Sequence, residues 1–491
     1  MSHWNDFERH INLLQNIQGA AGVLAWDQRT YMPPQGAAMR AAQSATLSGL
    51  YHKTLIDPAY GATLQALQED VGLDATQQRA AAVALRDYGR ATKLPTAFVE
   101  QFSAAKSAAH QAWVKAKTED DFASFAPHLR SLVDMSKEQA AYLGGENAVY
   151  DTLLDEYDQG MTVSFLEPMF KELGAGLSEL VQDAAQKEQP PLITTEFTDD
   201  ELTRLNTRVI QDLGFDLNKG RLDESEHPFT LGIGPDDVRL TTHNHATDLL
   251  GTLSGTIHEC GHGMYEQGLP LSLRPVGLCH AAGCGIHESQ SRFWENIIGS
   301  SMPFFRYLER VLTEETGKNI AAQRMYNASN RVVPSLIRIY ADETTYNLHI
   351  IIRFQLELAL FSGELEPEDA AEAWAEAYHK YLGIRPPSPQ NGVLQDVHWS
   401  SAYFGYFPSY TLGNLFAASF KSVMQNELPQ MWTQVEAGDF SEILAWLRTK
   451  VHEQGFLTTQ DQIVEAAVGP QNHVANLLAH LKERQKQIQM G

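Results

Sequence analysis

The sequence His258-Glu259-Cys260-Gly261-His262 brings two imidazoles and a carboxylate into a short segment. In a helix, residues four apart lie one turn apart on one face, so both histidines can reach a single metal ion. Glu259 would point toward the same cavity, where it can take a proton from a water molecule bound to the metal. A helical histidine pair also occurs in ordinary cores and on surfaces, so the motif needs a further ligand to predict zinc.

A catalytic zinc ion takes three protein ligands and keeps one open position. The downstream candidates for the third ligand are His280, His287 and Glu288. Glu288 lies near the start of a second predicted helix, residues 286–298, which could pack on the first. Its alternative role is an ion pair with Arg292, four residues further along this helix. Spacing does not choose between Glu288 and His280.

Two of the three cysteines, Cys279 and Cys284, lie close to these candidates. A structural zinc site would need four ligands at close spacing, and the sequence contains no Cys-x-x-Cys pair. We therefore interpret the cysteines as free, buried thiols.

The helix around His258 has an apolar stripe formed by Leu250, Leu253, Ile257 and Met264. This stripe would bury one flank and present both histidines to a cleft. Most of the chain has the same periodicity, with apolar residues three or four positions apart. We expect helices within residues 57–145, 163–186, 340–363, 366–382 and 472–487.

Residues 221–242 differ, because turn formers flank short runs of β-favouring residues, which predicts a small hairpin or sheet. Proline-containing segments at 187–200 and 383–392 are typical of surface loops. None of these breaks is long enough to separate domains. We expect a mainly α-helical fold in which residues 1–491 form a single catalytic unit, with two lobes.

The composition limits the protein's partners. The formal charge is −24, from 37 basic and 61 acidic residues, so the chain would repel nucleic acid. No apolar run approaches the roughly 18–20 residues that cross a bilayer, and the polar N-terminus is not a signal peptide. Three cysteines in so long a chain suit a reducing compartment. We expect a soluble cytoplasmic protein with no membrane or nucleic-acid partner.

Several motifs together resemble the Taq-type metallocarboxypeptidases, the thermostable carboxypeptidase family with a His-Glu-x-x-His site. The matches follow the family order from residue 26 to about residue 414 and so cover most of the chain. They are His287-Glu288-Ser289-Gln290-Ser291-Arg292, Ile337-Arg338-Ile339-Tyr340-Ala341-Asp342, Gly392-Val393-Leu394-Gln395-Asp396-Val397-His398-Trp399, His227-Pro228-Phe229, Asp237-Val238-Arg239-Leu240-Thr241, and Trp26-Asp27 with Tyr31-Met32-Pro33-Pro34.

The resemblance implies that Glu288 is the third ligand beside His258 and His262. It also implies a helical fold with zinc at the base of a deep groove, a homodimer, and removal of single residues from the free C-terminus of peptides. Glu259 would be the general base for zinc-activated water. Cobalt could occupy the same set of ligands.

Further residues are candidates for contacts with the substrate. His398, Tyr406 and Tyr410 could stabilise the oxyanion of the tetrahedral intermediate, because residues 405–413 are rich in turn formers and tyrosine. Aromatic packing and an ordinary loop histidine are the alternatives. By resemblance, Arg338 would bind the substrate carboxylate, with Arg239 as second candidate. Arg338 could instead pair with Asp342 on a helix, and Arg239 could brace the small sheet.

The sequence leaves open which residues orient the two histidines and which related function the fold serves. Zinc-bound histidines usually donate their second N–H to an acceptor, and Asp342, Glu295 and Asp396 are available. Among competing functions, a zinc endo-oligopeptidase could use the same ligands, and a catalytically silent helical scaffold could keep the fold. The remaining histidines near the motif are interpreted as wall or structural residues: His227, His243 and His245.

Overall fold

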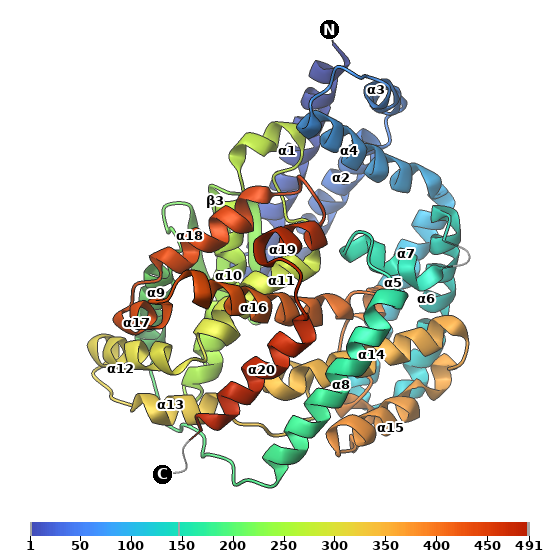
Figure 1. Cartoon of the computed structure of the whole chain (residues 1–491). Coiled ribbons are helices and arrows are strands. Elements are labelled where there is room, and N and C mark those ends of the chain that lie inside the picture. The colour runs from blue at the N-terminus through green and yellow to red at the C-terminus, as the bar shows by residue number, and fades with distance from the viewer. Residues whose placement is uncertain (1, 146–147, 489–491) are drawn as a thin grey trace.

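The computed structural model describes residues 2–145 and 148–488, and its elements are predominantly helical (Figure 1). The first group of helices forms the upper end of the molecule in Figure 1, and we call α1 to α4 the N-terminal arm. Its elements are α1 (His3–Thr30), η1 (Pro34–Gly36), α2 (Ala37–Leu55), α3 (Pro58–Gln68) and α4 (Ala75–Lys93).

The helices that follow the arm lie on the right side of Figure 1, where two later helices join them. The first set consists of α5 (Thr96–Glu119), α6 (Phe122–Leu143), α7 (Val149–Tyr157) and α8 (Val163–Ala185). The later ones are α14 (Glu343–Ser362) and α15 (Ala370–Leu382), and α14 packs on α8. The short 3-10 turns between residues 338 and 401 are η4 (Arg338–Tyr340), η5 (Pro367–Asp369), η6 (Pro389–Asn391) and η7 (Trp399–Ser401).

The remaining helices include α10, which contains the histidine motif. They are α9 (Asp199–Leu213), α10 (Leu249–Gly268), η2 (Leu271–Val276), α11 (Cys284–Arg292), η3 (Phe293–Ile298), α12 (Met302–Thr316), α13 (Ala322–Ser329), α16 (Phe407–Glu427), α17 (Met431–Ala437), α18 (Ser441–Lys450), η8 (His452–Gln454), α19 (Gln460–Val468) and α20 (His473–Lys486). Helix α16 crosses the centre of the molecule and packs along α11.

The expected small sheet is present and has three strands in the order β1-β3-β2: β1 (Gly220–Glu224), β2 (Thr230–Gly234) and β3 (Asp237–Thr242). Strands β2 and β3 form an antiparallel hairpin, whereas β1 pairs in parallel with β3, Leu222 opposite Leu240. Val238 and Leu240 on β3 are fully buried, and β3 packs against α10. The sheet therefore backs the helix that carries the histidine motif.

Helix α10 begins at Leu249, with Asp248 as its N-cap, whose carboxylate accepts a hydrogen bond from the amide of Gly251. The second predicted helix, 286–298, differs from a continuous α-helix. It consists of α11 to Arg292 and then a π-helical turn, η3, in which the Gly299 amide donates to the Trp294 carbonyl. Such turns occur often at functional sites because the extra residue rotates the side chains that follow.

A contiguous cluster of buried apolar side chains extends through the described residues from Phe7 to Leu481. The predicted helical runs at 163–186, 366–382 and 472–487 correspond to α8, η5 with α15, and α20, and the run at 340–363 corresponds to α14. The mainly helical fold with a small sheet is thus confirmed. No helix in residues 2–145 and 148–488 combines the length and apolarity needed to cross a membrane.

Candidate metal centre and active site

The side chains of His258, His262 and Glu288 converge on one point. Glu288 Oε2 lies 3.7 Å from His258 Nε2 and 3.4 Å from His262 Nε2. One ligand atom from each residue lies within 4.8 Å of the other two. Within the described part of the chain, this is the group of His, Cys, Asp and Glu side chains with such a geometry. The structure therefore brings together the three predicted ligands.

The convergence depends on glycines that let the helices approach closely. A Cβ atom on Gly261 of α10 would lie 2.6 Å from the carbonyl oxygen of Gln290 on α11. A Cβ atom on Gly413 of α16 would lie 2.5 Å from Cγ of Glu288. Such contacts are too short for any real side chain, so Gly261 and Gly413 set how near the three helices come.

His258 is oriented by Glu295, one of the three partners that remained open from the sequence. Its Nδ1 lies 2.8 Å from Glu295 Oε2, so that the ring N–H donates to the carboxylate and Nε2 faces Glu288. Glu295 lies on the π-helical turn η3 and also accepts from Ser254 Oγ at 2.7 Å. Burial opposes ionisation of Glu295, but Arg292 and His258 outweigh it and lower its pKa to about 2.

His262 has a different partner, which the sequence does not indicate. Its Nδ1 lies 2.6 Å from His287 Nδ1, and His287 Nε2 lies 2.8 Å from Glu266 Oε1. With Nε2 of His262 directed to Glu288, its Nδ1–H donates to His287, and the Nε2–H of His287 donates to Glu266. His287 therefore orients the candidate ligand His262, and His280 lies outside the cluster with an exposed side chain.

Glu288 is buried and strongly held in its ionised form. Its Oε1 accepts from Arg292 Nε at 2.7 Å, and its Oε2 accepts from Ser291 Oγ at 3.0 Å. Burial by itself raises the pKa of a carboxyl group, but the charges of Arg292 and His258 hold the pKa of Glu288 well below its usual value. The Glu288–Arg292 pair considered as an alternative does exist, yet it is buried and coexists with the ligand geometry.

Glu259 lies between the two histidines and contacts the small sheet. Its Oε2 accepts from Thr230 Oγ1 at 2.7 Å, and the same hydroxyl lies 2.9 Å from the Glu259 carbonyl oxygen. Burial raises the pKa of Glu259 above its ordinary value, although the charge of His258 and the Thr230 hydrogen bond oppose this. A carboxylate with a raised pKa is a better proton acceptor near neutral pH.

His398, Tyr406 and Tyr410 form one aromatic cluster at the start of α16. His398 Nε2 lies 3.2 Å from the Tyr410 hydroxyl, and the Tyr406 and Tyr410 rings pack edge to face at 5.1 Å. Burial lowers the pKa of His398 to about 3, so its ring is neutral at physiological pH. Burial and the nearby charge of Glu288 raise the pKa of both tyrosines, so both hydroxyls stay protonated.

Arg338 is buried and does not form the helical pair with Asp342. Its Nε and Nη2 donate to Asp396 Oδ1 at 3.0 and 2.8 Å, and its Nη1 donates to the Tyr346 hydroxyl at 3.1 Å. Asp342 instead caps α14 by accepting from the amides of Thr344 and Thr345. The guanidinium lies over the Tyr410 ring at 5.0 Å, so Arg338 belongs to the same neighbourhood as the aromatic cluster.

Arg239 lies on the opposite face of the sheet from α10. Leu240 points toward α10, because a Cβ on Gly263 would lie 2.7 Å from its Cδ2. Side chains alternate along a strand, so the neighbouring Arg239 points the other way. There it donates to Asp237 at 2.8 Å and lies over the Trp26 ring of α1 at 4.9 Å. This geometry fits the bracing role considered for Arg239.

The remaining sequence candidates have local partners. His243 Nδ1 lies 2.9 Å from the Ser225 carbonyl, and the His243 and His245 rings pack edge to face at 4.4 Å. Cys260, Cys279 and Cys284 are free thiols, and the metal-site geometry includes none of them. Burial raises the pKa of each thiol. The interpretation of the cysteines as free thiols is confirmed, but only Cys260 is fully buried, and Cys279 and Cys284 are partly exposed.

Three contributors were missed at the level of sequence: Thr230, Glu266 and Arg353. Arg353 donates to Asp396 Oδ2 at 2.6 Å, which fixes the carboxylate that holds Arg338. Glu266 follows His262 by four residues, so its position on one helix face with the motif was a usable signal. Thr230 and Arg353 are brought to the site from distant segments, and no local pattern indicates their roles.

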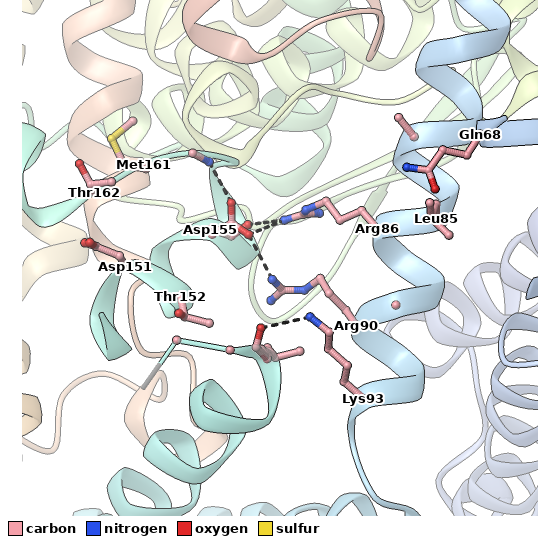
Figure 2. Close-up of a pocket in the computed structure, with 16 residues that line it drawn as sticks. Gln68, Leu85, Arg86, Arg90, Lys93, Asp151, Thr152, Asp155, Met161 and Thr162 are labelled. Carbon is pink, nitrogen blue, oxygen red and sulfur yellow. Dashed lines mark hydrogen bonds and ion pairs between the residues drawn. The ribbon is translucent and has the colours of Figure 1, made fainter. Parts of the chain in front are cut away.

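A separate cavity of about 620 Å³ lies between α4 and the α6–α7 region, and none of the candidate site residues lines it (Figure 2). Figure 2 shows Arg86 and Arg90 of α4 pointing across it toward Asp155 of α7. Asp155 Oδ2 accepts from both, at 2.8 and 3.1 Å. Both arginines of this cavity are therefore already paired with carboxylates from the facing helix.

Known proteins are similar to this chain in both sequence and fold. The sequence matches the family described as carboxypeptidase Taq (M32) metallopeptidase over residues 6–485. It is 38% identical to Thermostable carboxypeptidase 1 of Thermus thermophilus, covering 98% of this chain and 97% of that protein. It is 36% identical to Carboxypeptidase 1 of Bacillus subtilis, with 96% of each chain covered. The structure of the M32 carboxypeptidase from Deinococcus radiodurans superposes with a TM-score of 0.95, at 34% identity and 99% coverage of both chains.

A helical fold in which two histidines, a carboxylate and an adjacent glutamate converge is typical of a metallopeptidase. The chain belongs to the carboxypeptidase Taq (M32) family. It is therefore a metal-dependent carboxypeptidase, a hydrolase that acts on peptides. The endo-oligopeptidase and the silent scaffold considered from the sequence are not favoured.

Proposed function

We propose that the metal of this carboxypeptidase is zinc, held by His258, His262 and Glu288. Two imidazoles and one carboxylate form the usual set of a catalytic zinc site, and the three ligand atoms lie within 4.8 Å of one another. Cobalt(II) would be accepted by the same donors. When bound, the ion would polarise the scissile carbonyl and lower the pKa of a water molecule to about 7.

Glu259 acts as the general base in this proposal. It follows the ligand His258 directly in sequence. Its carboxylate is held by a hydrogen bond from Thr230 on strand β2. It takes the proton of the attacking water and later delivers it to the leaving amine. Its raised pKa supports both transfers, because a strongly acidic carboxyl would accept a proton poorly.

His398, Tyr406 and Tyr410 stabilise the oxyanion that develops on the scissile carbonyl. The hydroxyls remain protonated and can donate, because burial raises the pKa of both tyrosines. His398 is neutral, and its Nε2 contacts the Tyr410 hydroxyl, so it orients that donor. A preorganised donor in a water-poor site contributes strongly to catalysis.

Arg338 recognises the C-terminal carboxylate of the substrate. Asp396 and Tyr346 fix the guanidinium, while each Nη atom carries a second hydrogen that these bonds do not use. A planar guanidinium suits two-point binding of a carboxylate. Arg239, the second candidate, is less favoured, because its guanidinium donates to Asp237 and lies over the Trp26 ring, on the other face of the sheet.

The convergence of three ligands beside Glu259 is the observation that carries the mechanism. Its test uses a blocked dipeptide and a longer peptide with a free C-terminus, together with the same peptide amidated at its C-terminus. We expect stepwise loss of C-terminal residues from the free peptides, abolished by a chelator and restored by zinc, and little action on the amide. Internal cleavage that leaves the C-terminus intact would contradict the exopeptidase mechanism. Metal analysis of the purified protein should give one zinc per chain.

The remaining expectations belong to the same proposal. Three free thiols support action in the reducing cytoplasm, which cell fractionation can test. The family resemblance supports a homodimer, which light scattering of the purified protein can test. The buried cluster from Phe7 to Leu481 supports one catalytic unit over residues 1–491, which should unfold cooperatively. The deep groove that leads to the metal remains a prediction.

A further inference from the structure

Residues 155–158, at the end of α7, contact three different parts of the molecule in succession. Asp155 pairs with Arg86 and Arg90 across the cavity of Figure 2, and Glu156 also pairs with Arg90. The Tyr157 ring packs edge to face on Tyr406 at 5.0 Å. Asp158 is 3% exposed and reaches the two helices that carry Glu288 and Tyr410.

Asp158 connects α11 and α16 through its two carboxylate oxygens. Oδ1 accepts from the backbone amide of Gly285 at 2.8 Å, in the first turn of α11. Oδ2 accepts from the hydroxyl of Ser409 at 2.6 Å, in the first turn of α16. Both partners are buried, so water cannot replace Asp158 without rearrangement.

The N-terminus of α11 has no cap from its own N-cap residue, Gly283. Its free amides are satisfied by residues distant in sequence: Asp158 accepts from Gly285, and Gln460 Oε1 accepts from Ile286 at 3.1 Å. A Cβ on Gly283 would lie 2.8 Å from Asp158 Oδ1 and 2.7 Å from Gln460 Oε1, so glycine leaves room for both acceptors. A carboxylate at this end also interacts favourably with the helix dipole.

The two contacts lie next to the proposed catalytic groups. Glu288 follows Gly285 by three residues, which places it one turn further along α11. Tyr410 follows Ser409 directly on α16. We propose that Asp158 is a positioning residue that holds the ligand Glu288 and the oxyanion donor Tyr410 in a common geometry, an inference that rests on the proposed roles of those two residues.

The primary test compares Asp158→Ala, Asp158→Asn and the wild-type enzyme. The measurements are zinc affinity, from competition with a chromophoric chelator, and kcat and KM on a blocked dipeptide, both normalised to folded protein. Removing the acceptor should weaken zinc binding about 10- to 100-fold and lower kcat by a similar factor, as loss of a residue that orients a metal ligand typically does. Asparagine keeps an acceptor for Gly285, so Asp158→Asn should recover most of both values.

Asp151→Ala is the matched control. Asp151 lies on the same helix and accepts from the amide of Val163 at 2.6 Å, so it caps α8, which carries no candidate site residue. This variant should lose some thermal stability, while zinc affinity and kcat stay within about twofold of wild type. If Asp158→Ala behaves like Asp151→Ala per folded molecule, Asp158 has only a structural role and the proposal is wrong.

Ser409→Ala separates the two contacts of Asp158 and decides the matter if Asp158→Ala does not fold. It removes the link to α16 and keeps the link to α11. We expect kcat to fall several-fold with zinc affinity unchanged; an unchanged kcat would overturn the role of Asp158 at Tyr410. If wild type releases no C-terminal residues, the proposed function is wrong. The zinc affinities of Asp158→Asn and Asp158→Ala can still be measured in that case. They decide separately whether Asp158 positions the metal site.

Discussion

Helix α2 of the N-terminal arm and helix α16 of the metal centre have similar lengths, 19 and 21 residues, yet their environments differ. No residue of α2 is buried, and this helix packs mainly on α1. Helix α16, by contrast, is buried over most of its length, including polar residues such as Ser409 and Asn414. Helix α2 leaves every side chain at least partly exposed to water, whereas the centre must satisfy each polar group within the protein.

This difference shows where positional precision is concentrated. Around Glu288 the helices touch through glycines, and each buried carboxylate has named donors. In the arm, the contact of Arg40 with Asp27 lies partly in solvent. Substitutions of the same type should therefore have large effects at the centre and small effects in the arm.

The largest effect is expected for Glu259→Gln. The amide cannot accept the proton of the attacking water, so kcat should fall about 10²- to 10⁴-fold. The ligands remain, so zinc content and melting temperature should stay near wild type. Steady-state kinetics and metal analysis on one preparation test both expectations. Turnover within a few fold of wild type would reject Glu259 as the base.

A pair of Gly→Ala substitutions sharpens the comparison directly. At Gly261 the new Cβ would meet the α11 backbone at 2.6 Å, which should cost about 1–3 kcal/mol or more and weaken zinc binding. At Gly49 of α2 nothing lies within 4 Å, so alanine should stabilise the helix by about 0.5–1 kcal/mol. Denaturant unfolding of both variants measures the two changes in the free energy of unfolding, which should have opposite signs. Equal effects would show that helix spacing at the centre is not set by Gly261.

The pH dependence of stability tests the burial of Glu357. This carboxyl accepts from Tyr150, Trp399 and the Gly405 amide, and burial raises its pKa to about 7 from 4.5. The folded state therefore binds more protons than the unfolded state in this interval. The contribution of Glu357 to the free energy of unfolding is fully present below about pH 4.5 and is lost as pH rises through 7.

Glu357→Gln should flatten the fall in the free energy of unfolding between pH 5 and pH 7, although it lowers stability at pH 5 by leaving one donor unpaired. Urea titrations of wild type and variant across this range measure the slope. An identical slope in both proteins would mean that Glu357 does not titrate there.

The smallest effect is expected for Arg40→Ala in the arm. Arg40 donates to Asp27 and to the Leu24 carbonyl in a partly exposed setting, so its loss should cost about 1 kcal/mol. The core counterpart is Arg484→Ala, which leaves the carbonyls of Asn296 and Ile297 without their donor and should cost clearly more. Thermal unfolding of the two variants ranks them; the reverse order would contradict the comparison.

Much of the fold followed from local pattern. Helices α8, α15 and α20 lie where apolar periodicity predicted them, and β-favouring residues between turn formers predicted the sheet. The parallel pairing of β1 with β3 and the π-helical turn were not predicted. Both depend on packing partners distant in sequence, and a π-turn has no separate residue signature.

The candidate site divides in the same way. The spacing of His258, Glu259 and His262 predicted a shared helix face, and the family resemblance supplied Glu288. The partner of His258 remained open among three acidic residues until η3 placed Glu295 at 2.8 Å. The expected alternative for Arg338, a helical pair with Asp342, was wrong, because the chain there forms only a short 3-10 turn and Asp342 caps the next helix.

The sequence by itself determined the reactive groups, the helix face that holds two of them, and the family. Tertiary structure decided which acceptor orients each histidine, how Arg338 is held by Asp396, and that Asp158 joins α11 to α16. The physical reason is distance along the chain. Apolar periodicity indicates contacts between residues a few positions apart, whereas the hydrogen bonds that fix a buried polar group form wherever folding brings a partner within about 3 Å.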